Sequence, residues 1–456
     1  MRPSSSRSER GPAGGGLSDS GPGDSGRLFE SEPASGGLFD GVLAAGPVHA
    51  ATGDRAWLQA MLDVEAALAQ AAGAPPEVAA ACRAERFDIA ALGAAAAESG
   101  NPVVPLVRAL RAAVSPEAAR YVHAGATSQD ILDTAAMLVA RDALSLILAD
   151  VSAAASAAAR LAAAHRDTPV AARTLLQQAL PTTFGLVAAG WLAALDGAAD
   201  RLAAMRDSGL AVQLGGAAGT LAAFDSPSIV DRLAEGLGLP APALPWHTDR
   251  TRIADLTWPL GTACGVIAKV AGDVVLYAQT EVGEVAEGQP GGSSSLPHKR
   301  NPVAAISARA CAAQAPGLVA TLLGSMGHEH QRAAGAWHAE WAPFTGLLRA
   351  TGSAAHWLAR CLAHLRVDAA RMRGNLDITG GALLAERISA ALAPKVGPNE
   401  AHDLVRDAVA GGRPLAEALA DHFSPAELAT LLDPASYLGA APALTDRALK
   451  QHEERP

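Results

Sequence analysis

The chain of 456 residues is predicted to be all-α, because its apolar residues recur at helical spacing over most of its length. Half of the residues are hydrophobic, but only 4% are aromatic, and alanine is abundant. Helices of that composition can approach one another closely. No comparable alternation of apolar and polar residues predicts a strand. We therefore expect a bundle of long helices around a large core.

Five stretches are expected to form the long helices. In the clearest one, steps of three and four residues alternate along one face, which carries Leu260, Ala263, Ile267, Val270, Val274 and Tyr277. This helix is expected to continue towards Glu287. The other four cover about residues 134–165, 181–206, 303–324 and 335–366. Each is far longer than an average globular helix, which indicates a bundle.

Turn signals divide the chain into four segments. Residues 1–27 are rich in Ser, Gly and Arg and lack the apolar region of a secretory signal, so we expect a disordered tail. Gly-Asn-Pro and Ser-Pro turns follow near residue 100, and LRVDAARM at 365–372 opens a further helical region. We expect an N-terminal helical domain at 28–120, a central bundle at 121–365 and a C-terminal helical domain at 366–456.

The net charge and the cysteine spacing limit the binding partners and the cellular compartment expected for the protein. A formal net charge of −10 argues against a general nucleic-acid or anionic-membrane surface. No stretch of about twenty apolar residues is expected to span a bilayer. The four cysteines show no paired spacing, which indicates reduced thiols in a cytoplasmic protein. They are Cys82, Cys264, Cys311 and Cys361.

The most informative stretch is residues 291–303, which read GGSSSLPHKRNPV. Gly291 and Gly292 permit a turn, and Pro302 suits the first turn of a following helix. The unpaired N–H groups of that helix, together with Lys299, would favour a bound anion. Ser293 in that field could move a proton or attack a carbonyl. A Ser/Gly-rich surface linker is the simpler alternative, but the run Pro-His-Lys-Arg-Asn-Pro is unusual for a linker.

This loop resembles the signature loop of the fumarase/aspartase superfamily, GSSxMPxKxNP, with Leu296 in place of the usual Met. The resemblance implies that Ser293 transfers the proton next to a substrate carboxylate. It implies that Lys299 steadies the dianionic intermediate and that Asn301 holds substrate. It also implies a three-domain all-α subunit whose central bundle forms the core of a homotetramer, with each site shared between subunits.

Two further segments match motifs of the same superfamily. YVHAGATSQDILDT at 121–134 resembles HxGxTSxD, and RTLLQQALPTTFG at 173–185 resembles RTHxQxAxPxTFG. The substrate-binding residues implied by the three segments are Asn301, Thr127, Ser128, Gln129, His123, Thr174, Gln177, Arg173, His298 and Arg300. Two local alternatives stay open: TSQD could simply cap a helix, and His298 and Arg300 could be solvated loop charges.

The chain departs from the lyases of the superfamily at two linked positions. Leu175 stands where those lyases carry a general-acid histidine, and Ile306 stands where they carry its glutamate partner. A carboxylate leaving group is a weak base and needs no such acid. The departures therefore favour the bacterial carboxymuconate cycloisomerase branch, which the chain resembles from about Leu38 to Leu449. That branch implies a tricarboxylate substrate, 3-carboxy-cis,cis-muconate, and lactone formation by intramolecular carboxylate addition, in the protocatechuate branch of the β-ketoadipate pathway.

Three other functions compete with this one. They are a C–N lyase of the adenylosuccinate lyase type, a Ser–Lys hydrolase and a catalytically silent homologue. The implied reaction requires no metal and no redox cofactor. Metal binding would need the His/Glu cluster at 328–340, whose spacing is atypical of zinc sites; its members are His328, Glu329, His330, His338 and Glu340. His247 could line the site or be a turn histidine bonded to backbone.

Overall fold

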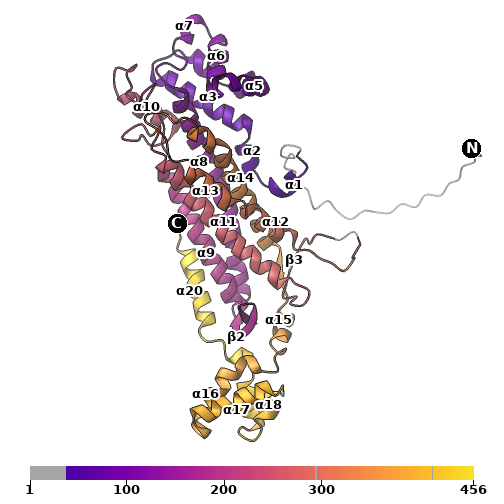
Figure 1. Ribbon diagram of the computed structural model, residues 1–456. Helices are drawn as coiled ribbons and strands as arrows, with labels where there is room; N and C mark the ends of the chain where they lie inside the picture. The colour runs from indigo at the N-terminus through magenta and orange to yellow at the C-terminus, as the bar shows by residue number, and fades with distance from the viewer. Residues whose placement is uncertain (1–36, 293–294, 413, 456) are drawn as a thin grey trace, which may run out of the picture. The chain divides into compact units, whose positions relative to one another are not determined.

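The computed structural model describes residues 37–292, 295–412 and 414–455 of the chain, and the structural statements below concern these residues. They are mostly helical (Figure 1), which confirms the predicted fold class. The N-terminal part consists of helices only: α1 (Asp40–Leu43), α2 (Val48–Ala51), α3 (Asp54–Ala71), α4 (Pro76–Ala81), η1 (Ala84–Arg86), α5 (Ile89–Ser99), α6 (Val103–Ala112) and α7 (Pro116–Ala119).

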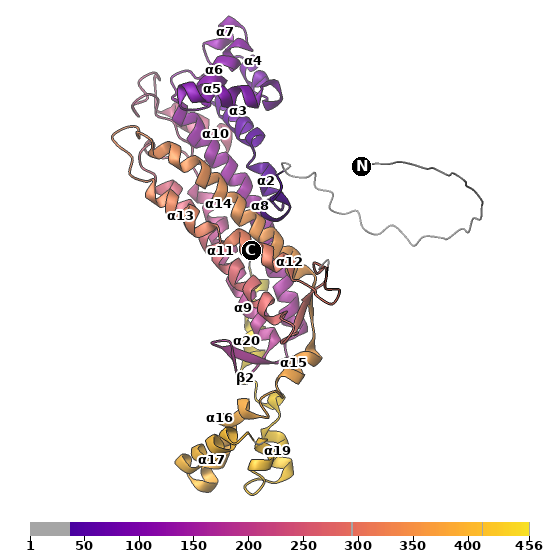
Figure 2. The same cartoon turned by 45° about the vertical axis from the view of Figure 1, so that its right-hand side comes forward.

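Long helices then form the bundle. They are α8 (Ser128–Ala164), α9 (Phe184–Ala204) with its π-helical end η2 (Met205–Gly209), α11 (Thr251–Tyr277), α12 (Val303–Ala312), α13 (Ala315–Gly324) and α14 (Ala336–Ala363), with the shorter α10 (Ser228–Leu237) beside α3. α8 packs against α9 and α14, and α14 also packs against α11, α12 and α13, so these helices lie side by side (Figure 2). Alanines on the buried face of α8 let α9 approach closely.

The C-terminal region is built from shorter helices. They are α15 (Ala369–Asn375), η3 (Ala382–Leu384), α16 (Ala385–Val396), α17 (Pro398–Ala410), α18 (Leu415–Ala418), α19 (Pro425–Leu431) and η4 (Pro434–Ser436), followed by α20 (Ala441–Glu453), which returns to pack on α9. The buried apolar residues form one large cluster between Val48 and Met372 and a second, smaller one that includes Leu384, Leu392 and Phe423. The exact domain boundaries stay predictions.

Four short strands occur where no strand was expected. β1 (Pro169–Thr174) pairs antiparallel with β2 (Gln177–Thr183), and β3 (Val285–Glu287) pairs antiparallel with β4 (Leu365–Val367). Each strand is too short for its alternation to stand out from the helical pattern on either side.

Two helix predictions were wrong, one at its end and one in its middle. The helix expected to reach Glu287 ends at Tyr277, where the chain turns through Gly283 (φ 64°) and the Glu284 N–H bonds the Tyr277 carbonyl at 2.9 Å. The helix expected over 303–324 breaks into α12 and α13 at Ala313 and Gln314. Pro316 lies in the first turn of α13, where its missing N–H costs nothing.

Two stretches of the described chain have the length and apolar composition of a membrane span, although no such stretch was expected. Thr251–Tyr277 and Val303–Gly324 are long and apolar enough by length and composition. Core helices of soluble proteins pass the same test, and α11 packs against α9, α12, α13 and α14. The apolar character of both stretches therefore agrees with their place in a helix bundle.

Candidate functional site

The loop at 291–301 is closed at its base by backbone hydrogen bonds. Gly291 and Asn301 exchange two N–H···O bonds of 3.0 Å each, and the loop stands away from the bundle between β3 and α12 (Figure 1). A Cβ at position 291 would lie 2.2 Å from Cγ2 of Val303, so this position requires glycine. Ser293, the predicted proton-transfer residue, lies outside the described residues.

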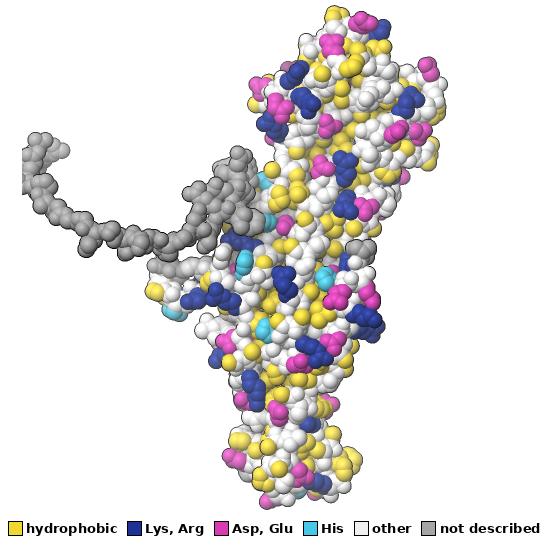
Figure 3. Space-filling view, turned by 180° about the vertical axis from the view of Figure 1, so that it is seen from behind, with side chains coloured by type: hydrophobic (Ala, Val, Ile, Leu, Met, Phe, Trp, Pro, Cys, Tyr) yellow, Lys and Arg dark blue, Asp and Glu magenta, His cyan; other side chains and the backbone are white. Residues whose placement is uncertain are grey.

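The basic side chains of this loop have no acidic partner within the described part of the chain. His298, Lys299 and Arg300 are exposed, and none of them forms an ion pair with a carboxylate of the described residues. Figure 3 shows histidine and basic side chains gathered on a projecting part of the surface, where this loop lies. Three adjacent cationic or protonatable groups without acidic partners can attract an anion with several carboxylates.

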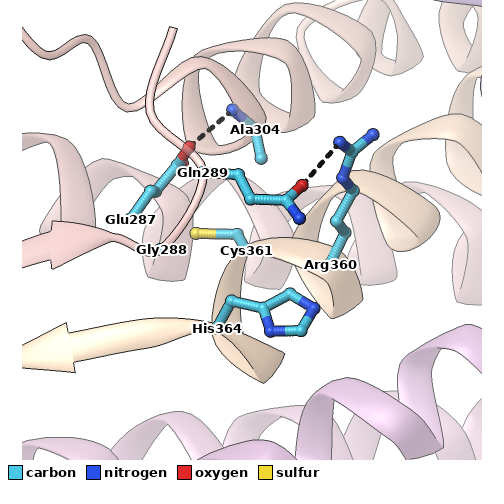
Figure 4. Close-up of a pocket in the computed structure, with 7 residues that line it drawn as sticks. All are labelled: Glu287, Gly288, Gln289, Ala304, Arg360, Cys361 and His364. Atoms are coloured by element: carbon cyan, nitrogen blue, oxygen red, sulfur yellow. Dashed lines mark hydrogen bonds between the residues drawn. The ribbon is translucent and has the colours of Figure 1, made fainter. Parts of the chain in front are cut away.

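The predicted anion site at the N-terminus of α12 is already occupied by the protein itself. Glu287 accepts hydrogen bonds from the N–H groups of Ala304 (3.1 Å) and Ala305 (2.8 Å), as Figure 4 shows for Ala304. The Val303 N–H bonds the Asn301 carbonyl at 2.9 Å. The first N–H groups of the helix are therefore not available to a ligand, and the expectation that they bind the substrate was wrong.

The first predicted segment forms the start of α8. Thr127 is its N-cap, and the Thr127 N–H donates to Asp130 Oδ2 at 2.9 Å, so TSQD caps a helix as the simpler alternative proposed. Ser128 follows as the first helical residue, and both it and Thr127 are partly exposed. His123 has a positive φ of 58° and is held by buried Glu65, with Nδ1 2.7 Å from Oε1.

Behind that segment lies a buried polar network that the sequence did not predict. The Asp130 carboxylate accepts the N–H groups of Gly215 and Gly216 at 2.9 Å each, and Nε2 of His247 lies 2.6 Å from Oδ1. His247 thus bonds a carboxylate rather than the backbone. Gln129, predicted to contact substrate, is buried and donates to the His247 carbonyl at 2.8 Å. The sequence signal for this network was the presence of acidic residues such as Asp130 within an otherwise apolar helix.

The same network engages Glu340 of the candidate metal cluster. Buried Arg250 binds Asp133 (2.7 Å) and Glu340 (2.7 Å), and Nε2 of His328 lies 3.1 Å from Glu340. Burial raises the pKa of Glu340, although Arg250 opposes that shift. His338 bonds the Gly100 carbonyl at 2.9 Å. Within the described ranges, no group of three His, Cys, Asp or Glu side chains could hold a metal ion.

The second predicted segment is the β1–β2 hairpin. Thr174 pairs with Gln177 at its tip, and between them Leu175 and Leu176 have positive φ angles of 51° and 65°. Their exposed fractions are 96% and 70%. Arg173 forms two hydrogen bonds with buried Glu284, at 2.7 and 2.8 Å, so its guanidinium is engaged within the protein.

The first and second segments lie at opposite ends of α8. The 37 residues of this helix span about 55 Å at 1.5 Å per residue. Thr127 is at its N-terminus, and the hairpin follows its C-terminus. One chain therefore does not bring the two segments together. Ile306, the second position that departs from the superfamily lyases, is on α12 and 47% exposed.

Comparisons with known proteins agree with this architecture. The model of a lyase family matches residues 45–317. A nitrosuccinate lyase of Streptomyces davaonensis is 48% identical over 447 residues, covering 91% of this chain and 94% of the relative. A 3-carboxy-cis,cis-muconate cycloisomerase of Bradyrhizobium diazoefficiens is 47% identical over 443 residues, covering 91% and 98%. The crystal structure of 3-carboxy-cis,cis-muconate lactonizing enzyme from Pseudomonas putida matches with a TM-score of 0.86 and 42% identity, covering 91% of this chain and 99% of that one.

Proposed function

Because the chain belongs to this lyase family and has the fumarase/aspartase-like fold, we propose that it is a cycloisomerase that interconverts 3-carboxy-cis,cis-muconate and 4-carboxymuconolactone. The observation that carries the proposal is the similarity to enzymes of that name over 91% of the chain, both in sequence and in structure. The absence of a histidine at 175 and of a glutamate at 306 agrees with a reaction that needs no general acid for a leaving group.

In the lactonising direction, one carboxylate oxygen adds to a carbon of the diene and forms a C–O bond. The electron pair of the broken π bond moves towards the neighbouring carboxylate and gives an enediolate. Ser293 then gives a proton to the carbon next to that group. Lys299 and Asn301 stabilise the negative charge that develops on this carboxylate. Their interaction with it is stronger in the transition state than in the bound substrate. Since Glu287 occupies the start of α12, the loop cations take the larger share of that stabilisation.

The remaining predicted residues divide into two groups by their contacts. His123, Thr127, Ser128, Thr174 and Gln177 are partly or fully exposed and are proposed to bind the carboxylates with His298 and Arg300. Gln129 and Arg173 donate to buried protein groups, so we infer that they hold their segments in place.

A homotetramer with shared sites is part of the proposal. About 55 Å of helix separates the first two segments in one chain, so they can meet only if another copy supplies one of them. Large apolar side chains are exposed on the bundle, among them Trp258 (69%) and Leu323 (46%). Figure 3 shows apolar side chains over the bundle, interspersed with charged ones. We propose that these apolar surfaces are buried between subunits of the tetramer. We also propose that the protein is cytoplasmic.

Nitrosuccinate elimination is a second candidate, favoured by the 48% identity to a nitrosuccinate lyase. That reaction would break a C–N bond and release nitrite, which is a weak base like a carboxylate. It would therefore also proceed without an acid at position 175. The adenylosuccinate type of C–N lyase releases an amine, a much stronger base, and is disfavoured by Leu175 and Ile306.

The test compares three substrates with purified protein and with Ser293→Ala. We expect rapid loss of the ultraviolet absorbance of 3-carboxy-cis,cis-muconate with the unchanged protein, and little with the variant. Release of nitrite from nitrosuccinate, without loss of muconate absorbance, would replace the first candidate by the second. Turnover of adenylosuccinate alone would contradict both.

A further inference from the structure

Glu287 joins the two ends of the loop that carries Lys299 and Asn301. It is the last residue of β3, before the loop, and its carboxylate binds the N–H groups of Ala304 and Ala305, after the loop. Only 6% of its surface is exposed. A single side chain thus connects backbone on both sides of the loop (Figure 4).

The Cys361 side chain on α14 lines the same small cavity as this carboxylate. Burial, with a further contribution from the charge of Glu287, raises the pKa of the Cys361 thiol. The thiol therefore stays neutral beside Glu287 at neutral pH. The nearby Arg360 bonds the Gln289 side chain at 3.1 Å instead. Glu287 forms no ion pair among the described residues, and its carboxylate is bound by the N–H groups at the start of α12.

The backbone beside Glu287 is equally constrained. A Cβ at Gly288 would lie 2.7 Å from the His364 carbonyl oxygen, and one at Gly291 would lie 2.2 Å from Val303. β3 is also paired with β4. The cavity between these groups holds about 10 Å³, which is too small for an organic substrate. These contacts indicate a rigid support for the loop rather than a second binding site.

We propose that Glu287 is a positioning residue that fixes Asn301 and Lys299 relative to the bundle. It does so by binding the N–H groups of Ala304 and Ala305, which follow Asn301 and Pro302 at the start of α12. This role in the reaction rests on the proposed function, whereas the anchoring itself does not. Because Glu287 uses the helix N-terminus, a bound anion must be held by the side chains of the loop.

The test combines hydrogen exchange with kinetics for Glu287→Gln, Glu287→Ala and a control, Asp368→Asn. The glutamine has one acceptor oxygen and can serve one of the two N–H groups, whereas alanine can serve neither. We expect amide exchange in residues 302–312 to accelerate in the order wild type, Gln, Ala. We expect kcat to fall about tenfold or more for Gln, with a smaller change in KM. Asp368 caps α15 outside the loop, and asparagine also caps helices, so the control should match wild type.

Wild-type exchange and wild-type kcat in Glu287→Gln would overturn the inference, even if Glu287→Ala fails to fold. Faster exchange confined to residues 302–312, with lower kcat and an unchanged melting temperature, supports it. If the wild type turns over none of the three acids but the exchange pattern is as expected, the anchoring is supported and the proposed function is contradicted.

Discussion

Lys299 carries a full positive charge on the exposed part of the loop, without an acidic partner among the described residues. A surface cation of this kind adds little to stability. It can, however, add much to a reaction in which negative charge develops on a polycarboxylate. His298 and Arg300 lie next to it in the sequence. The removal of one of these neighbours would therefore leave most of the positive potential of the loop in place.

Replacement of Lys299 by alanine should lower kcat/KM by about 10²–10³-fold and leave the melting temperature unchanged, since the side chain stabilises charge in the transition state. Steady-state kinetics and calorimetry measure both. Lys450→Ala serves as the control, because Lys450 on α20 pairs with Glu454 directly after that helix and is not part of the loop. A Lys299 variant within twofold of wild type would exclude the proposed role.

The four cysteines are buried, and burial raises the pKa of each thiol. For Cys264 and Cys311 the raised values are about 11, and for Cys82 about 12. We therefore expect the folded protein to react very slowly with a thiol reagent at pH 8, and fully after unfolding in guanidinium. Rapid labelling of the folded protein at that pH would contradict this burial.

The same shifts predict a pH dependence of stability. Since the folded state favours the neutral thiols, their contribution is complete below the unfolded pKa of about 9 and is lost as pH rises through about 11. Chemical denaturation between pH 8 and 11 should show a falling free energy of unfolding, and Cys264→Ala should weaken that fall.

At the scale of the helix, the start of α8 depends on a single carboxylate. Asp130 is fully buried and receives N–H donors from Thr127, Gly215 and Gly216. His247 supplies the fourth contact, so Nε2 must carry the proton there. A loop more than eighty residues away is thereby tied to the segment that carries Thr127 and Ser128.

Asp130→Asn should destabilise the protein by about 3 kcal/mol, because the new NH₂ group faces other donors and leaves a buried group unsatisfied. Thermal or denaturant unfolding measures this loss. Asp142→Asn on the exposed side of the same helix is the matched control and should change stability by less than about 0.5 kcal/mol. Equal stability of the two variants would show that the four contacts at Asp130 contribute nothing net.

At the scale of the whole molecule, the parts of the site are distributed along a helix of about 55 Å. Leu175 at the hairpin tip is an apolar residue with a positive φ, and it is 96% exposed. Nothing in the described chain covers its side chain. A second copy of the chain that brings the hairpin to the loop or to the start of α8 would account for both observations.

Complementation between inactive variants tests this arrangement. Lys299→Ala and Gln177→Ala should each be poorly active alone, but mixed subunits should recover about a quarter of wild-type activity, because random assembly places both intact segments in about one site in four. The mixture is made by partial denaturation and refolding together. Lys299→Ala mixed with Asn301→Ala is the control, since both lesions lie in one segment, and it should recover nothing. Recovery in neither mixture would contradict shared sites.

The sequence by itself determined the helical class, the long helices and the loop that carries Lys299. Helical spacing and the composition of a loop are local properties, so they can be read without the fold. The resemblance drawn from the same residues led to the right family and favoured a muconate, whereas nitrosuccinate became a candidate only through the comparison with a relative. Both leaving groups are weak bases, and the residues at 175 and 306 suit either.

Tertiary structure alone decided where α11 ends, how β3 meets β4 and which donors remain available to a ligand. Strand pairing between residues 285 and 367 leaves no local pattern. Glu287 reaches backbone groups 17 and 18 residues further along the chain, and His247 lies 117 residues from Asp130. N–H groups are identical in every residue, so the sequence cannot show which of them a distant carboxylate will occupy. For that reason the start of α12 looked like an anion site, and only the folded chain shows that Glu287 fills it.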